Sequence, residues 1–225
     1  MINYFSLIYL GAGLSSLAVS LLVYRSYKKS GNRGQRDLSL TFGCMFFHAI
    51  SLSLPVMIAP ENLPAIAAGF IIGIVFVFLL FIIGLQVELS IARPLFVSYV
   101  KELSTVVAIL GAVAINVLIF DFRLPYFQDG VIFWNVNPYI AWLIGGLSFL
   151  YGVIWSYMFF RSGGLTKNAS QKTKMFVLSI DGLLIGIAAL LVFTSTSVVQ
   201  TNIGLLLFIV STLTTAVILL VTRTK

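Results

Sequence analysis

One acidic residue stands inside a stretch that is otherwise hydrocarbon. Asp181 lies in KMFVLSIDGLLIG, residues 174–186, about seven residues beyond the start of an apolar run. At the rise of an α-helix this places the carboxyl group roughly 10 Å deep in a membrane. A charge at such a depth costs about 2.5 kcal/mol or more, so the group is expected to face other helices, to pair, or to be protonated.

Polar side chains in the other apolar runs are the candidate partners of this acid. No Lys or Arg lies deep within any run, which leaves His48, Gln86, Glu88, Asn116 and Tyr157. His48 lies roughly 15 Å from the end of its own run, so His48 and Asp181 differ only modestly in their depth in the membrane and can meet. An Asp–His pair titrates as a unit and can sense protons. A structural role explains His48 and Asp181 equally well, because a buried hydrogen bond between helices would fix their rotation. Glu88 and Tyr157 are near enough to a membrane surface for their side chains to reach water, which explains them without any function.

A second group of candidates lies toward the opposite membrane surface. In RLPYFQDGVIFWNV, residues 123–136, an Asp-Gly pair separates two aromatic and β-branched segments, which predicts a short β-hairpin with a two-residue turn. The residues that can line an outer cavity beside it are Trp134, Tyr139, Trp142, Thr194 and Thr196. An aromatic belt at the membrane surface explains the rings equally, and the hydroxyls can bond to their own helix.

Seven apolar runs must position these residues. Sixty percent of the 225 residues are hydrophobic and nine percent are charged, against about 45–50% and about 25% in soluble domains. The runs have the length of a membrane-spanning helix and lie near residues 4–24, 38–59, 65–90, 103–120, 138–160, 175–197 and 203–222. The first run lacks a basic region before it, so it is expected to be retained rather than cleaved. We therefore predict an all-α membrane protein whose residues 1–225 form one seven-helix domain.

The basic residues predict the direction of the helices. Thirteen of the fourteen Lys and Arg residues fall in alternate connections and at the end of the chain, and Arg123 is the exception. Because short loops rich in Lys and Arg stay in the cytoplasm, the amino terminus is expected outside and the carboxyl terminus in the cytoplasm. The hairpin between the fourth and fifth helices is then extracellular. The pattern predicts a multi-pass integral membrane protein of the bacterial inner (plasma) membrane.

Small residues predict how the helices meet. Gly69 and Gly73 form one GxxxG pair, and Gly182 and Gly186 form another. Such pairs let two helices approach closely in a bilayer, either within one bundle or between two copies of a chain.

Several kinds of chemistry are excluded by composition. One His and one Cys do not supply the three clustered ligands of a zinc hydrolase, and the chain has no Gly-rich phosphate loop and no nucleophile elbow. We expect no enzyme activity, no cofactor, no metal and no nucleic-acid partner. The topology is that of a microbial rhodopsin, but the seventh run has no lysine to bind retinal.

The layout resembles the seven-helix membrane region at the amino terminus of many bacterial sensor histidine kinases. The similar features are a first helix that ends in LVYRSYKKSG (22–31), a long outer segment, and YGVIWSYMFFRSGGLTKNASQKTK (151–174) before a Gly-bearing helix. The resemblance implies an outer or intramembrane ligand pocket coupled to a cytoplasmic output after the last helix. The sequence has no histidine phosphoacceptor and no ATP-binding domain, which leaves a stand-alone relative, a partner of a separate protein, or a sensor region without its output.

Three functions remain open. The first is a non-enzymatic membrane sensor in which a small hydrophobic ligand, a lipid or a proton biases helix packing, with a cytoplasmic or membrane protein as possible partner. The second is a small solute transporter of three-plus-one-plus-three helices, which calls for related halves and broken helices. The third is an accessory subunit of a larger membrane complex.

Overall fold

The computed structural model describes residues 4–92 and 99–221, with side chains except those of residues 88–92 and 219–221. Within these ranges the helices are α1 (Tyr4–Ser30), α2 (Arg33–Ile58), α3 (Leu63–Ala92), α4 (Val100–Phe120), α5 (Pro138–Leu165), α6 (Ala169–Phe193) and α7 (Val198–Val221). Two strands, β1 (Tyr126–Gln128) and β2 (Val131–Phe133), lie between α4 and α5. All seven helices are long and apolar enough to cross a membrane. The predicted seven-helix bundle is confirmed.

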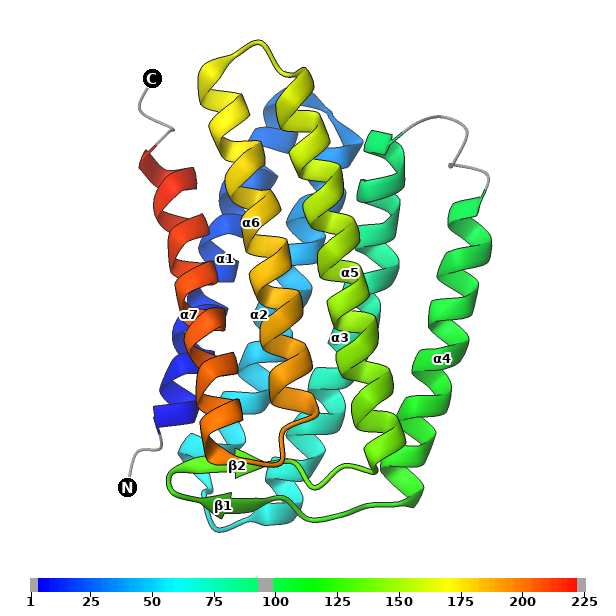
Figure 1. Ribbon diagram of the computed structural model, residues 1–225, viewed down its shortest axis with the longest axis vertical. Helices are drawn as coiled ribbons and strands as arrows, with labels where there is room; N and C mark the ends of the chain where they lie inside the picture. The colour runs from blue at the N-terminus through cyan, green and yellow to red at the C-terminus, as the bar shows by residue number, and fades with distance from the viewer. Residues whose placement is uncertain (1–3, 93–98, 222–225) are drawn as a thin grey trace.

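The helices stand side by side in the order of the sequence (Figure 1). Each helix from α1 to α7 contacts the next, and α1 also contacts α7, which closes the ring. Contacts between α3 and α5 leave α4 on the outside of the bundle. The hairpin covers the end at which α1 begins, and α7 ends at the opposite end. We call these the hairpin end and the basic end.

Asparagine caps set the starts of four helices, including α3, where Asn62 accepts a hydrogen bond from the backbone of Ala65 at 3.0 Å. The side chain of Asn168 accepts a hydrogen bond from the backbone of Gln171 at 3.1 Å, and Asn32 and Asn137 cap α2 and α5 in the same way. These caps satisfy backbone donors that have no partner in the first helical turn. As a result α6 starts at Ala169 instead of near residue 175, because the cap and not the change in hydrophobicity determines where the helix begins.

Both glycine pairs are used for packing within the chain. A methyl group on Gly73 would meet Nδ1 of His48 at 3.2 Å, so α2 lies directly on α3 there. A methyl group on Gly186 would meet Cα of Gly152 at 3.2 Å, so the backbones of α5 and α6 touch. The absence of side chains lets neighbouring helices approach to backbone contact.

The hairpin has the predicted turn. Asp129 and Gly130 both have positive φ, 49° and 77°, which is the pattern of a type I′ turn. Tyr126 pairs with Phe133 across the strands, and their rings stack at 5.2 Å between centroids. The three residues of β2 are buried while those of β1 are exposed. The hairpin therefore covers the bundle with its second strand.

Candidate functional site

A cavity of about 100 Å³ lies inside the bundle, between its two hydrophobic core clusters. The cluster toward the hairpin end supplies Tyr9 and Phe81 to its wall, and the cluster toward the basic end supplies Phe42 and Trp155. Of the described helices, only α4 contributes no side chain to this lining. The cavity is thus surrounded by six helices that approach from all sides.

Asp181 is the acidic group of this cavity. It is the thirteenth residue of α6, about 18 Å from the start of the helix, and its side chain is 5% exposed. Its carboxylate accepts a hydrogen bond from the hydroxyl of Ser211 on α7. Thr215, one turn further along α7, borders a second, smaller cavity together with Asp181. The buried acid therefore joins α6 to α7 and also faces open space.

His48 borders the same cavity from α2 but bonds elsewhere. Its Nδ1 lies 3.0 Å from the backbone oxygen of Gly73 on α3. Because a carbonyl oxygen only accepts, Nδ1 carries the proton in this contact. Among the described residues no hydrogen bond or ion pair joins His48 to Asp181, and the observed partner of the acid is Ser211.

Three of the remaining candidates for pairing, Gln86, Asn116 and Tyr157, lie away from the cavity. The side chains of Gln86 and Tyr157 are exposed on the outside of their helices. Asn116 is exposed on α4 and donates to the backbone oxygen of Ala112 in its own helix at 2.7 Å. The side chain of Glu88 lies outside the described residues.

The outer candidates divide into one buried ring and four more accessible residues. Trp134 is buried and stacks on Phe70 with 4.5 Å between centroids. Tyr139 and Trp142 are 86% and 62% exposed on α5. Thr194 donates to its own helix, and Thr196 is exposed. Of these five, Trp134 alone borders a cavity in the described part of the chain, a small one beneath the hairpin.

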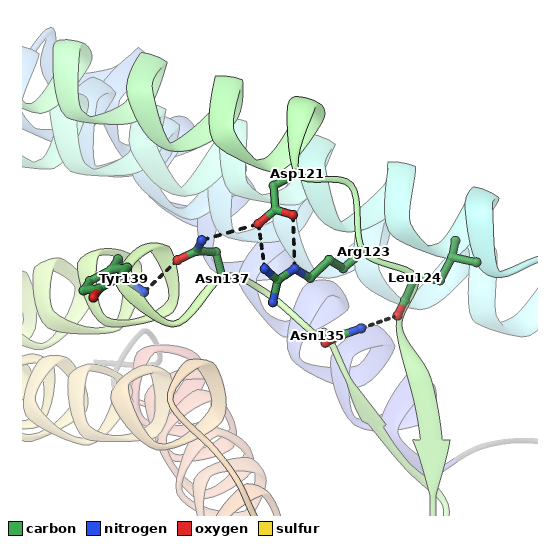
Figure 2. A network of polar contacts seen from close by, with 6 residues as sticks. All are labelled: Asp121, Arg123, Leu124, Asn135, Asn137 and Tyr139. Carbon is green, nitrogen blue, oxygen red and sulfur yellow. Dashed lines mark hydrogen bonds and ion pairs between the residues drawn. The ribbon is translucent and has the colours of Figure 1, made fainter.

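A polar network holds the hairpin end together (Figure 2). Asp121, directly after α4, accepts a hydrogen bond from Nε of Arg123 at 3.1 Å and another from the amide of Asn137 at 3.4 Å. These hydrogen bonds, from Arg123 first, hold the pKa of the Asp121 carboxyl below its usual value. Asn137 in turn caps α5 through the backbone of Tyr139. The network ties the end of α4 to the start of α5 and serves to anchor the hairpin.

Several lining residues carry no signal in the sequence that marks them. Thr41 on α2 and Ser148 on α5 border the cavity as isolated hydroxyls, and each bonds to a backbone oxygen of its own helix. Trp155 lies against α6 because its indole nitrogen donates to the backbone oxygen of Leu178 at 3.0 Å. The sequence does indicate that Ile185 can lie beside the acid, because it follows Asp181 by four residues and so lies on the same face of α6.

No protein-family model, no curated protein and no solved structure matches the chain. The function therefore has to be inferred from the cavity and its chemistry.

Proposed function

We propose that this protein is a non-enzymatic membrane sensor whose ligand occupies the cavity between the six helices. The observation that carries the proposal is the cavity itself, lined by six separate helices and bordered by a buried acid. Helices in a bilayer are held together by close packing and a few polar contacts. A ligand that fills space between them biases their arrangement by its differential contacts with each state.

The charges at the two ends of the bundle support a direction for this sensor. At the basic end, Lys28 and Lys29 lie in the last turn of α1, Arg33 and Arg36 lie at the start of α2, and Lys167 lies between α5 and α6. At the hairpin end, Glu61 lies between α2 and α3, Asp121 follows α4, and Asp129 lies in the hairpin turn. Under the positive-inside rule the basic end faces the cytoplasm. The sensor then carries its hairpin outside and delivers its output where α7 ends, as in the sensor regions of histidine kinases that the layout resembles.

The proposed coupling is tested by measuring whether a cavity ligand moves the helices at the basic end. Spin labels are placed at Lys167→Cys, beside the α5–α6 pair, and at Val217→Cys, exposed on α7 near the basic end, with the buried Cys44 replaced by Ser. Distances between them are measured by electron resonance in nanodiscs, with and without 1-hexanol as the probe. A shift in the distance distribution is expected with the alcohol.

A matched pair of variants separates the cavity from the lipid. Ala189 borders the cavity, so Ala189→Leu fills it, whereas Ala112 is exposed on α4 and Ala112→Leu changes only the outer surface. The distance shift should persist in the Ala112 variant and disappear in the Ala189 variant. Equal shifts in both variants, or none in the unmodified bundle, would refute the proposal.

A solute transporter is the second candidate, favoured by the position of α4. This helix lies outside the bundle, between α1–α3 and α5–α7, as a linker between two three-helix halves would. Alternating access requires the cavity to open to both sides of the membrane. Labelling of Ala189→Cys by a membrane-impermeant thiol reagent from each side in turn would favour the transporter, and labelling from one side or neither would favour the sensor.

A further inference from the structure

We propose that the ligand of this cavity is a lipophilic amine, with its ammonium group at Asp181 and a short alkyl chain along α6; this inference rests on the sensor function proposed above. The volume of the cavity alone does not specify the class of its ligand. Three features of the lining lead to it, namely an acid without a cation, aromatic walls, and an elongated apolar face.

The acid has no cationic partner in the part of the chain that the structure describes. The ion pairs among the described residues are Arg36–Asp37 and Arg123–Asp121, and both lie at the ends of the bundle. The other titratable side chains that face the cavity are His48, Tyr9 and Tyr151, and the His48 proton is directed to a backbone oxygen. A buried carboxylate is strongly stabilised when a cation is brought to it. The site therefore lacks the charge that an ammonium ligand supplies.

Aromatic rings form two walls of the cavity. On one side the centroids of Phe81 and Tyr151 are 5.0 Å apart, and those of Tyr151 and Trp155 are 5.9 Å apart. On the other side Tyr9 packs on Phe208 at 5.4 Å. The faces of such rings attract a cation within about 6 Å, most strongly for Trp and most strongly away from water.

Trp155 packs against the residue that follows the acid. A methyl group on Gly182, the residue after Asp181, would meet Cγ of Trp155 at 2.9 Å, so the indole lies directly against this part of α6. The hydrogen bond from its indole nitrogen to Leu178 keeps the ring in place. A cation at Asp181 is thereby offered both a carboxylate and an indole.

The rest of the cavity suits an alkyl chain. One face of α6 lines the cavity, and the residues along it include Asp181, Ile185, Ala188, Ala189 and Val192. They extend over about 17 Å of helix, with the acid at one end and aliphatic groups beyond it. A volume of about 100 Å³ admits one short chain and excludes an intact phospholipid.

Three probes with the same six-carbon chain test the inference: hexylamine, 1-hexanol and hexanoate. Trp155 reports binding by its fluorescence after Trp134→Phe and Trp142→Phe remove the other two tryptophans. The measurements are made at pH 7 in nanodiscs, and the signal of the same protein with Ala189→Leu is subtracted as partitioning into lipid. Hexylamine is expected to bind more tightly than hexanol by about tenfold, which corresponds to about 1.4 kcal/mol, and hexanoate should bind most weakly.

Asp181→Asn locates the head group. This variant should bind hexanol as the parent protein does, which also shows that it is folded, and it should lose the preference for the amine. A retained preference would overturn the placement at Asp181. The ranking of the three probes in the protein with native Asp181 tests the ligand class even if the variant is unstable.

The outcomes distinguish this inference from the function on which it rests. If hexanol and hexylamine bind equally well, the amine class is overturned and the sensor function stands. If none of the three probes changes the emission of Trp155 beyond the filled-cavity control, both the amine class and the ligand-binding function are overturned.

Discussion

A single methyl group at Gly152 should force α5 and α6 apart. This glycine lies where the two backbones touch, and a Cβ there would meet Cα of Gly186 at 2.9 Å and its backbone nitrogen at 3.1 Å. It would also overlap the backbone oxygen of Gly182. Backbone atoms cannot rotate away as the end of a flexible side chain can, so the helices themselves must move.

The size of the movement follows from the contact distances. Carbon atoms pack best at about 3.5–4.0 Å, so the contact at 2.9 Å requires the helices to separate by about 0.6 Å or more. Overpacking of this kind costs about 1–3 kcal/mol in protein cores. We therefore expect Gly152→Ala to lower the free energy of unfolding by about that amount. Because Gly152 and Gly182 also border the cavity, the same variant should alter the binding of 1-hexanol.

Equilibrium unfolding in mixed micelles measures the change, and the chain offers a matched control. Gly146 lies on the same helix, and a methyl group added to it would have nothing within 4 Å. Gly146→Ala should leave the stability unchanged or raise it by up to about 1 kcal/mol, since alanine favours the helix. Equal stability of the two alanine variants would refute the backbone contact between α5 and α6.

Two further predictions concern polar contacts. Ser211→Ala removes the donor to Asp181 and should lower the free energy of unfolding by about 0.6–1.7 kcal/mol, from the average to the largest value measured for hydrogen bonds between membrane helices. Thr214 is exposed and bonds to its own helix, so Thr214→Ala should have no such effect in the same unfolding assay. The lowered pKa of Asp121 means that its contribution to stability is present at neutral pH and declines as the pH falls below about 4, the usual aspartate value, toward the lowered one. The protection factors of the hairpin amides, which correct for the intrinsic pH dependence of hydrogen exchange, should therefore fall in acid. An Arg123→Gln variant should show a weaker pH dependence of these factors, and an unchanged profile would contradict the anchoring role.

The gross architecture could be predicted because its signals are local and strong. Apolar runs of membrane-spanning length gave the number of helices, and the Asp129-Gly130 pair gave the hairpin turn. The helix starts were placed less well, since asparagines such as Asn168 cap helices outside the hydrophobic run. A sliding measure of hydrophobicity does not respond to a single capping side chain.

The partner of the acid could not be predicted, because it depends on how each helix is rotated. Helices that are apolar on all sides, such as α5, carry little periodicity that would define an inner face. The sequence therefore offers several candidate partners for Asp181, with His48 among them, whereas Asp181 bonds to Ser211 on the next helix and His48 bonds to the backbone of Gly73. Gly73, which allows the contact with His48, stands out in the sequence as half of a GxxxG pair. The sequence does not show which residue packs against it.

The contacts of α6 indicate which helix a ligand would move. Toward α5, the backbones touch at Gly152, and Ser156 and Ser179 are joined by hydrogen bonds of 2.8 and 3.1 Å, so this pair resists displacement. Toward α7, the close approach is at Gly204 near the hairpin end, where a methyl group would meet the backbone oxygen of Ala188 at 3.0 Å.

From Gly204 to Val221, α7 extends for about 25 Å toward the basic end, and the link between its Ser211 and Asp181 lies along this stretch. A ligand that competes with Ser211 for the carboxylate would loosen that link while the contact at Gly204 remains. The expected motion is therefore a pivot of α7 about Gly204, against a fixed α5–α6 pair. Its displacement would be largest at the basic end, where a cytoplasmic partner could detect it.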